Sequence, residues 1–256
     1  MNETSPLDLA QLQRSCARCS LQALCLQAGL TAQDVERLDG MVRRRRALVP
    51  GQRLFRIGDP LSTIYVARIG AFKTASITEQ GEEQLVGLHL PGELIGLDAL
   101  GEGAHRCEAI ALSKANVCEV PFDQLALVAA QLPNLQHQLL RVIGQGVDRD
   151  HDHMALLARR RANERIALFL HGLGERFRQS GHSPTSFTLP LSREDVGRYL
   201  GVALETVSRG FTSLQDDGVI WVRGRRVEVL DPDELKRLAH GDEAGAEAAA
   251  SHPRLF

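Results

Sequence analysis

Short apolar stretches separated by turn signals fill the chain between Ala47 and Val120. The turn signals, such as Pro50-Gly51 and Pro91-Gly92-Glu93, recur about every ten residues, a spacing typical of a small β-sandwich or β-roll. No helical pattern alternates with these stretches, which argues against a parallel sheet built from β-α-β units. We therefore predict a β-roll with a sensory role, within a domain of residues 31–132.

A helical spacing of apolar residues flanks this region on both sides. On the N-terminal side, Thr31 can cap a helix, and the apolar residues that follow share one face, which predicts a helix over residues 31–46. On the C-terminal side, Pro133-Asn134 opens a helix that runs to about Leu157, and we assign residues 133–158 to it.

Apolar residues of the second helix recur in steps of three and four, which is typical of a coiled-coil seam. Asp150 lies on this seam, where a partner helix would bring a second aspartate close and weaken a homodimer by like-charge repulsion. A polar seam residue can alternatively set only the register of the pair. The predicted seam residues are Leu139, Ile143, Gly146 or Val147, Asp150, Met154 and Leu157.

Residues 159–240 are expected to form a mainly helical domain that contains a helix-turn-helix. Ser192 can cap the first helix, and Gly201 permits a tight turn before a second helix of residues 204–215. Two short strands around Arg223-Gly224-Arg225 then predict a basic wing suited to phosphates.

Three polar residues, Glu205, Ser208 and Arg209, face outward near the start of the second helix. A recognition helix meets base edges at this end. Arginine can grip guanine O6 and N7, and glutamate can accept a hydrogen bond from cytosine N4. The segment therefore predicts sequence-specific binding to double-stranded DNA.

Charge and composition support this assignment only locally. The 256 residues carry a formal net charge of −2, but residues 159–240 hold 14 Lys/Arg and 11 Asp/Glu. No apolar run approaches the ~20 residues of a membrane helix, and no signal-like segment opens the chain, so we expect a cytoplasmic protein without membrane contact. Residues 241–256 are predicted to be a disordered tail. The runs Arg43–Arg46 and Arg159–Arg161 are expected to be solvated faces.

Five cysteines are present, and three of them, Cys16, Cys19 and Cys25, fall within ten residues. An odd count in a reducing compartment argues against a disulfide framework and favours metal or redox chemistry. The spacing matches neither ferredoxin pattern, so zinc and an iron–sulfur cluster both remain open on spacing alone. The two other cysteines are Cys107 and Cys118.

Several segments together resemble the CRP/FNR superfamily, and within it the oxygen-sensing FNR/ANR group. The resemblance implies an α+β fold made of a cyclic-nucleotide-binding-type β-roll, a long dimerisation helix and a C-terminal winged helix-turn-helix. It also implies a transcription regulator rather than an enzyme. The matching segments are CARCSLQALC, GQRLFRIGDP, ITEQGEEQLVGLHLPGELIGLDAL, NVCEVPF, MALLARRRANERIALFL and REDVGRYLGVALETVSR.

The resemblance also implies a cofactor. FNR-like proteins hold a [4Fe–4S] cluster with three cysteines spaced C-x2-C-x5-C and one distant cysteine. Carried over, the metal ligands are Cys16, Cys19, Cys25 and Cys118, and residues 1–30 become the cluster-binding arm. Cys107 matches no ligand of the family.

A switch follows from the same resemblance. The cluster would stabilise the dimer under low oxygen, with Asp150 as the dimer switch. Glu205, Ser208 and Arg209 match the E-x-x-S-R pattern that reads a TTGAT…ATCAA palindrome, and the dimer would regulate anaerobic genes. It would recruit RNA polymerase through exposed loops of the roll, with Thr78–Gly87 in the best-matched region.

Two other classes of function stay open from the sequence. In a cyclic AMP sensor of the CRP type, Gly92-Glu93 and Arg106 would hold the ribose and the phosphate, although Cys107 replaces the usual hydroxyl residue. An enzyme or electron carrier is disfavoured, since we find no Gly-rich phosphate loop and no nucleophile beside a base. His151 and His153 could bind a metal, but we expect them on a solvated face.

Overall fold

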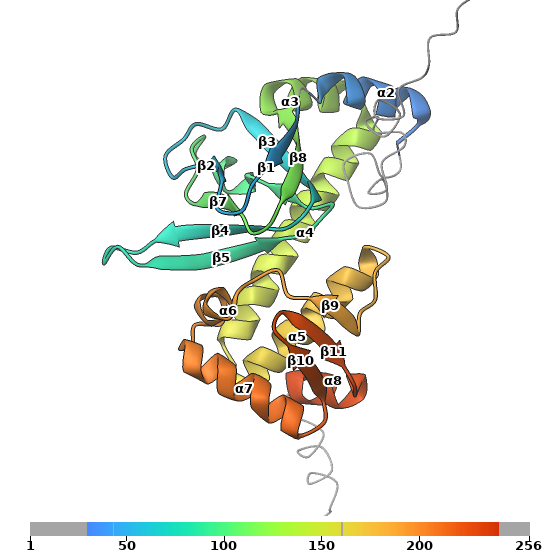
Figure 1. Ribbon diagram of the computed structural model, residues 1–256. Coiled ribbons are helices and arrows are strands. Elements are labelled where there is room, and N and C mark those ends of the chain that lie inside the picture. The colour runs from blue at the N-terminus through green and yellow to red at the C-terminus, as the bar shows by residue number, and fades with distance from the viewer. Residues whose placement is uncertain (1–29, 43, 160, 241–256) are drawn as a thin grey trace, which may run out of the picture. The chain divides into compact units, whose positions relative to one another are not determined.

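A computed structural model describes residues 30–42, 44–159 and 161–240 (Figure 1). Most of the predicted arm, including Cys16, Cys19 and Cys25, and the predicted tail lie outside these residues. The chain divides into two compact units between Asp150 and His151, inside one long helix.

The first unit contains two antiparallel four-stranded sheets, as expected for a β-roll. One sheet has the strand order β1-β8-β3-β6, and the other has the order β2-β7-β4-β5. A dry core that includes Phe55, Phe72 and Val117 is formed by residues of both sheets. The strands are β1 Arg44–Leu48, β2 Arg53–Phe55, β3 Thr63–Ile69, β4 Phe72–Ile77, β5 Glu83–His89, β6 Leu94–Ile95, β7 Glu108–Ala111 and β8 Ala115–Pro121.

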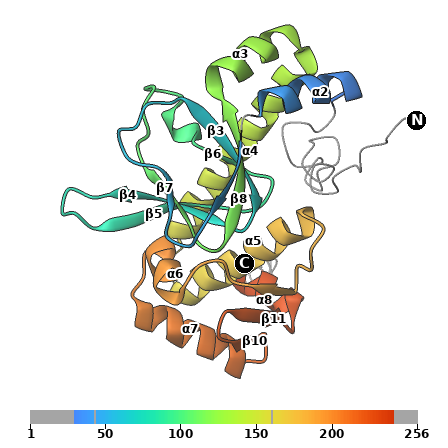
Figure 2. The same ribbon diagram turned by 45° about the horizontal axis from the view of Figure 1, so that its top comes forward.

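Helices close one end of this roll. α2 (Ala32–Met41), α3 (Phe122–Gln131) and the start of α4 (Pro133–Leu157) pack around a second core cluster (Figure 2). Leu38, Leu125 and Leu135 are the buried contributions of the three helices, and they meet Ile64 and Val66 of β3. A short 3₁₀ turn, η2 (Leu97–Ala99), follows β6.

The helix predicted over residues 31–46 is too long. Thr31 does cap it, since its hydroxyl accepts the Asp34 N–H, but α2 ends at Met41 and β1 begins at Arg44. β1 is an edge strand paired only with β8, and Arg46 forms an ion pair with Glu119 at 3.8 Å. Residues 44–46 of the basic run therefore lie on an edge strand, where charged residues discourage pairing with other chains.

The second unit packs helices against a small sheet of order β10-β11-β9. Its core is formed by apolar residues of α5, α6 and α7, among them Ile166, Val196 and Val207. The predicted helix-turn-helix and wing are both present. The elements are α5 Ala162–Gln179, β9 Ser186–Thr188, α6 Arg193–Leu200, α7 Leu204–Asp216, β10 Ile220–Arg223, β11 Arg226–Val229 and α8 Pro232–His240.

Candidate nucleic-acid interface and switch elements

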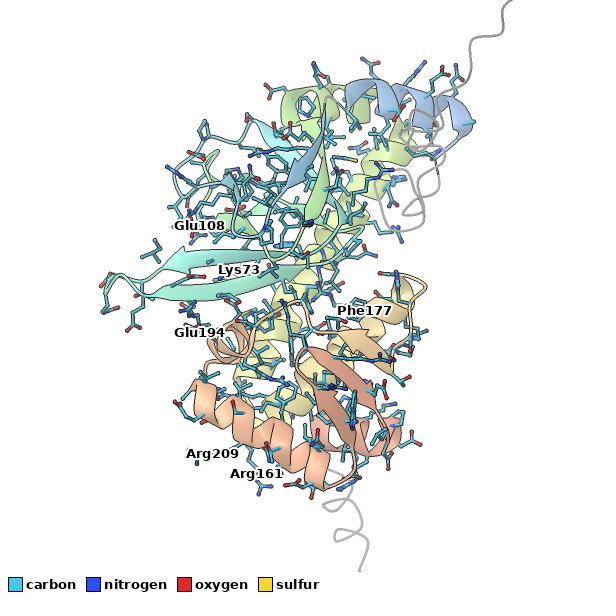
Figure 3. All side chains as sticks on the ribbon, viewed as in Figure 1. Lys73, Glu108, Arg161, Phe177, Glu194 and Arg209 are labelled. Carbon is cyan, nitrogen blue, oxygen red and sulfur yellow. The ribbon has the colours of Figure 1, made fainter. Side chains whose placement is uncertain are left out.

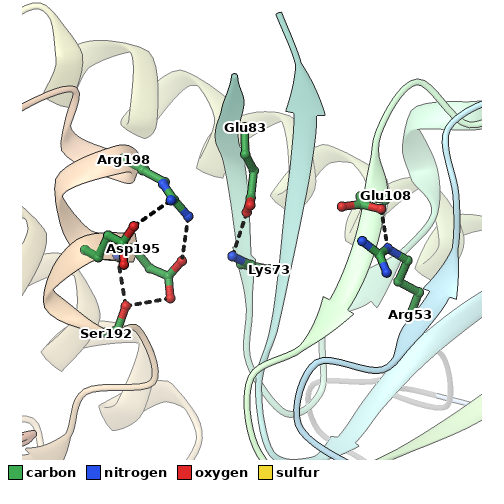
Figure 4. Close-up of polar contacts among 8 residues, drawn as sticks. Arg53, Lys73, Glu83, Glu108, Ser192, Asp195 and Arg198 are labelled. Atoms are coloured by element: carbon green, nitrogen blue, oxygen red, sulfur yellow. Dashed lines mark hydrogen bonds and ion pairs between the residues drawn. The ribbon is translucent and has the colours of Figure 1, made fainter. Parts of the chain in front are cut away.

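Local signals position the first helix of the helix-turn-helix. The Ser192 hydroxyl accepts the Asp195 N–H at 3.0 Å and donates to the Asp195 carboxylate at 2.8 Å, so it caps α6 (Figure 4). Arg198 pairs with Glu194 at 2.6 Å one turn away. Gly201 ends the helix with a φ of +63°, a conformation that favours glycine.

The three predicted DNA-contacting residues lie on one exposed face of α7. Glu205, Ser208 and Arg209 are all exposed, and Ser208 and Arg209 stand three and four positions after Glu205, which is one helical turn. Figure 3 shows Arg209 on α7. The opposite face of the helix is buried through Val207, Phe211 and Leu214. This face offers a carboxylate, a hydroxyl and a guanidinium to a ligand, with the chemistry needed to read base edges.

Gly210 lies where α7 packs closely against α5. A Cβ atom at Gly210 would overlap Cδ1 of Ile166 and lie 2.9 Å from Oδ1 of Asn163. A larger residue here would therefore force these two α5 side chains to shift. The sequence signal was a glycine in mid-helix, where it is unfavourable by about 1 kcal/mol unless packing requires it.

Two side chains cap the last carbonyls of α6, and sequence reasoning missed both. Nε2 of His153 lies 2.7 Å from the Tyr199 carbonyl oxygen, and the imidazole stacks on the Tyr199 ring at 3.9 Å. Arg165 donates to the Leu200 and Gly201 carbonyls at 2.9 and 3.4 Å. The expectation that His153 lies on a solvated face is wrong, because a ring 46 residues away in sequence covers it; His151 is exposed.

The wing forms as predicted, but its two basic tip residues differ in role. Gly224 has a φ of +61° at the turn between β10 and β11. Arg225 donates to the carbonyls of Leu189 and Pro190 and so braces the loop before α6. Arg223 is exposed, which suits it to a phosphate.

A half-buried cation lies between α6 and α7. The Arg193 guanidinium carbon stands 3.4 Å from the centroid of the Phe211 ring, a cation–π geometry. Burial lowers the pKa of Arg193 to about 10 from its usual 12.5. Its buried Nη1 has no hydrogen-bond partner among the described residues, so the aromatic face is its main compensation.

Cys118 lies at the end of the roll that α2, α3 and the start of α4 cover. It is on β8, partly exposed, and packs against the core cluster of Leu38 and Val66. Leu30 packs against the same cluster. Leu30 follows Cys25 by five residue steps, and a segment of this length spans at most about 18 Å. The remaining proposed ligands lie outside the described residues.

Cys107 is more deeply buried than Cys118. It is 5% exposed and belongs to the core between the sheets. Burial, with the neighbouring Asp98 carboxylate, raises the pKa of the Cys107 thiol well above its usual value. The Cys107 thiol donates to Asp98 at 3.2 Å. This thiol is therefore unsuited to binding metal as a thiolate.

The long helix carries an exposed apolar stripe. Leu140, Val147 and Met154 are 60%, 47% and 58% exposed and recur every seven residues. Ile143, Asp150 and Leu157 alternate with them in steps of three and four, so the stripe has heptad spacing. Leu139, a predicted seam residue, instead packs against the core of the roll, and the exposed apolar residue at this end of the stripe is Leu140. Asp150 is exposed on this stripe.

Glu93, one of the residues suggested for a cyclic nucleotide, contacts other residues of the first unit. The Glu93 carboxylate accepts the Leu90 N–H at 3.0 Å and lies 4.0 Å from the Arg149 guanidinium. The Arg106 side chain is exposed. Within the described ranges, no group of three or more His, Cys, Asp or Glu side chains is placed to hold a metal ion. No helix in these ranges is long and apolar enough to span a membrane.

The segment suggested for polymerase contact is a hairpin tip with an ordered turn. Thr78–Gly87 comprises the turn between β4 and β5 and most of β5. Thr78 and Glu82 bond across the turn at 2.9 Å, and Lys73 pairs with Glu83 at 2.6 Å nearer the base (Figure 4). Ile77 is exposed beside this turn, which leaves an apolar side chain at the tip.

Comparison with known proteins agrees with this architecture. Residues 164–238 match the Crp-like helix-turn-helix domain, and residues 45–131 match the cyclic nucleotide-binding domain. The solved structure of FixK2 from Bradyrhizobium japonicum superposes with a TM-score of 0.70 at 28% identity, covering 76% of this chain and 96% of that one.

Curated relatives extend the match across most of the sequence. Transcriptional activator protein anr of Pseudomonas aeruginosa is 46% identical over 91% of this chain and 96% of its own. The fumarate and nitrate reduction regulatory protein of Escherichia coli is 39% identical over 88% and 90%. The chain therefore belongs to the CRP/FNR family of DNA-binding transcription regulators, which are not enzymes.

Proposed function

We propose that this protein is an oxygen-responsive transcription activator that binds DNA as a dimer when it holds a [4Fe–4S] cluster. Its ligands are Cys16, Cys19, Cys25 and Cys118. The observation that carries the proposal is that Leu30, the last residue of the predicted arm, and Cys118 both pack against one core cluster of the roll. The names of the relatives support an anaerobic role.

The donor set suits the group. Four cysteine thiolates complete one [4Fe–4S] cluster, and when bound this cluster supplies a link that oxygen degrades. Cys118 is partly exposed on β8, whereas Cys107 is buried and hydrogen-bonded to Asp98. Thiolate ligands on the arm and on β8 would tie the arm to the roll beside α2 and the start of α4.

The exposed apolar stripe of α4 is the surface through which cluster binding by the arm and β8 would affect dimerisation. Leu140, Val147 and Met154 would pair with the same residues of a second copy, while the two Asp150 carboxylates repel each other. When the cluster holds the start of α4 in place, pairing of the two helices offsets the repulsion between the Asp150 carboxylates. When the cluster is lost and the arm is released, nothing offsets this repulsion. A shift of only a few kcal/mol is enough to move such an equilibrium.

The paired α7 helices then present two recognition faces, about one DNA turn apart, to a TTGAT…ATCAA palindrome. Glu205, Ser208 and Arg209 contact base edges, and Arg223 contacts phosphate. The β4–β5 hairpin at Thr78–Gly87 is the surface offered to RNA polymerase. The protein works in the cytoplasm.

The deciding experiment is purification without oxygen, followed by assay of iron and acid-labile sulfide and of visible absorbance as air is admitted. We expect about four iron and four sulfide per chain and a brown band that bleaches in air. Zinc without sulfide, or no metal, would contradict the proposal.

Two cysteine variants sharpen this test. Cys118→Ser should lose the cluster, while Cys107→Ser, which removes the other thiol of the roll, should keep it. Loss of iron in Cys107→Ser but not in Cys118→Ser would reverse the ligand assignment.

DNA contact by α7 predicts a base-specific effect of Arg209. Arg209→Ala should weaken binding to the palindrome by about 1–3 kcal/mol and relax preference at the guanine it reads. Arg223→Ala should weaken binding to all sequences alike and reduce its salt dependence. Both are measured by fluorescence anisotropy with matched and mutated palindromes. Equal loss on every sequence for Arg209→Ala would remove it from base readout.

A further inference from the structure

Several hydrogen-bond donors of the roll converge on one carboxylate. Asp98 Oδ2 accepts the backbone N–H of Arg106 at 2.8 Å and that of Cys107 at 3.3 Å. It also accepts the Cys107 thiol at 3.2 Å, and Oδ1 lies 3.2 Å from Nδ1 of His105. Three consecutive residues thus direct their polar groups at a single anion.

His105 and Cys107, which direct polar groups at this carboxylate, are buried, whereas the Asp98 side chain is 21% exposed. His105 is 4% exposed, and its ring stacks on Phe55 with centroids 3.6 Å apart. Cys107 is 5% exposed. Gly96, with a φ of +102°, leaves room for the imidazole, because a Cβ there would lie 3.3 Å from Cε1 of His105. The donors are therefore held in fixed positions rather than gathered by Asp98.

Consecutive amide N–H groups with an imidazole form a general anion-binding arrangement. Residues 45–131 match a domain that is named for cyclic nucleotides. The phosphate of a cyclic nucleotide is a phosphodiester that carries one negative charge. We infer that the Asp98 carboxylate is an internal substitute for such an anion, which closes the roll to cyclic nucleotides and other phosphate ligands.

Asp98 lies close to α4, so the replacement of a bound anion by its carboxylate can affect this helix. Leu97, next to Asp98, lies so close to Gly146 of α4 that a Cβ on this glycine would meet Cδ1 of Leu97 at 3.2 Å. Asp150 of α4 also acts electrostatically on Cys107. Because the Asp98 carboxylate is part of the chain, the anion position beside α4 is always filled, and the roll stays in its anion-filled conformation. Ligand control of α4 through this site is thereby lost, independently of any cluster on the arm.

The test compares the full-length protein with Asp98→Ala, using inorganic phosphate and cyclic 3′,5′-AMP as probes. Thermal unfolding is followed at matched ionic strength in chloride. The variant should unfold at a lower temperature, and phosphate at about a hundredfold excess over its Kd should raise its Tm by about 5–10 °C. The original protein should show no phosphate-specific shift, and no heat with cyclic AMP in calorimetry.

Two further variants serve as controls. The Asp59 carboxylate accepts the Arg56 N–H at 2.8 Å in the same roll, and a change to alanine keeps the Asp59 carbonyl that accepts the His105 N–H, so Asp59→Ala should lose stability without gaining a phosphate response. Asp98→Asn keeps an acceptor oxygen but no charge; it should fold with a lower Tm and ignore phosphate.

Several results would overturn the inference. Cyclic AMP binding to the unmodified protein would do so, as would an Asp98→Ala variant that phosphate stabilises no more than it stabilises Asp59→Ala. A wild-type Tm for Asp98→Asn would show that no anion is required. Should Asp98→Ala fold in neither phosphate nor chloride, phosphate does not replace the carboxylate. None of these readouts depends on iron content or DNA binding, so the cluster proposal can fail separately.

Discussion

At the scale of single residues, helix propensity alone would favour alanine at position 210, but the packing around Gly210 makes this substitution costly. Gly210→Ala should gain about 1 kcal/mol in helix propensity and lose about 1–3 kcal/mol through overlap with Ile166, so we expect net destabilisation. The change in unfolding free energy is measured by urea denaturation. Gly172→Ala on α5, where nothing lies within 4 Å, is the control and should be neutral or stabilising. A more stable Gly210→Ala variant would contradict this packing.

His171 predicts a pH dependence for the second unit. Burial lowers the pKa of His171 below 6.5, with Glu175 opposing the shift and His240 and Lys236 adding to it. The unfolded chain then binds a proton more readily, so this contribution to stability is complete above pH 6.5 and is lost as pH falls towards the lowered pKa. His171→Gln should flatten the unfolding free energy between about pH 7 and 5. An unchanged slope in this variant would assign the dependence to another group.

At the scale of elements, the carbonyl end of α6 depends on a side chain from α5. Arg165 also donates to the Arg159 carbonyl at 2.9 Å, so one guanidinium joins the start of α5 to the turn of the helix-turn-helix. Arg165→Met should cost about 2–3 kcal/mol of unfolding free energy and weaken DNA binding. Arg178→Met, which removes an exposed pair with Glu175, should cost below about 0.5 kcal/mol. Equal losses would show that the α6 contacts add little.

At the scale of the whole molecule, the α4 stripe predicts the oligomeric state. Asp150→Ala removes like-charge repulsion from the seam and should leave the protein dimeric in air, as measured by analytical ultracentrifugation. Asp148→Ala removes an equal charge from the same helix outside the heptad positions and should remain monomeric in air. A monomeric Asp150→Ala variant would contradict the proposed switch.

The sequence alone predicted the elements whose signals are local. The Ser192 cap, the Gly201 turn and the apolar spacing of residues 204–215 each act within one or two helical turns, so α6 and α7 were predicted almost to the residue. Thr31 likewise predicted the start of α2, although its end was misplaced. The outward face of Glu205, Ser208 and Arg209 followed from the same periodicity.

Features that join distant segments were decided only by the tertiary structure. Residues 44–46 form a strand because β8 lies beside them, about seventy positions later in the chain. His153 is covered by Tyr199, Gly210 packs closely against Ile166, and Asp98 meets donors from residues 105–107. Periodicity and caps report contacts within one element, whereas these features depend on which surfaces meet after folding. The local pattern therefore carries no signal for them.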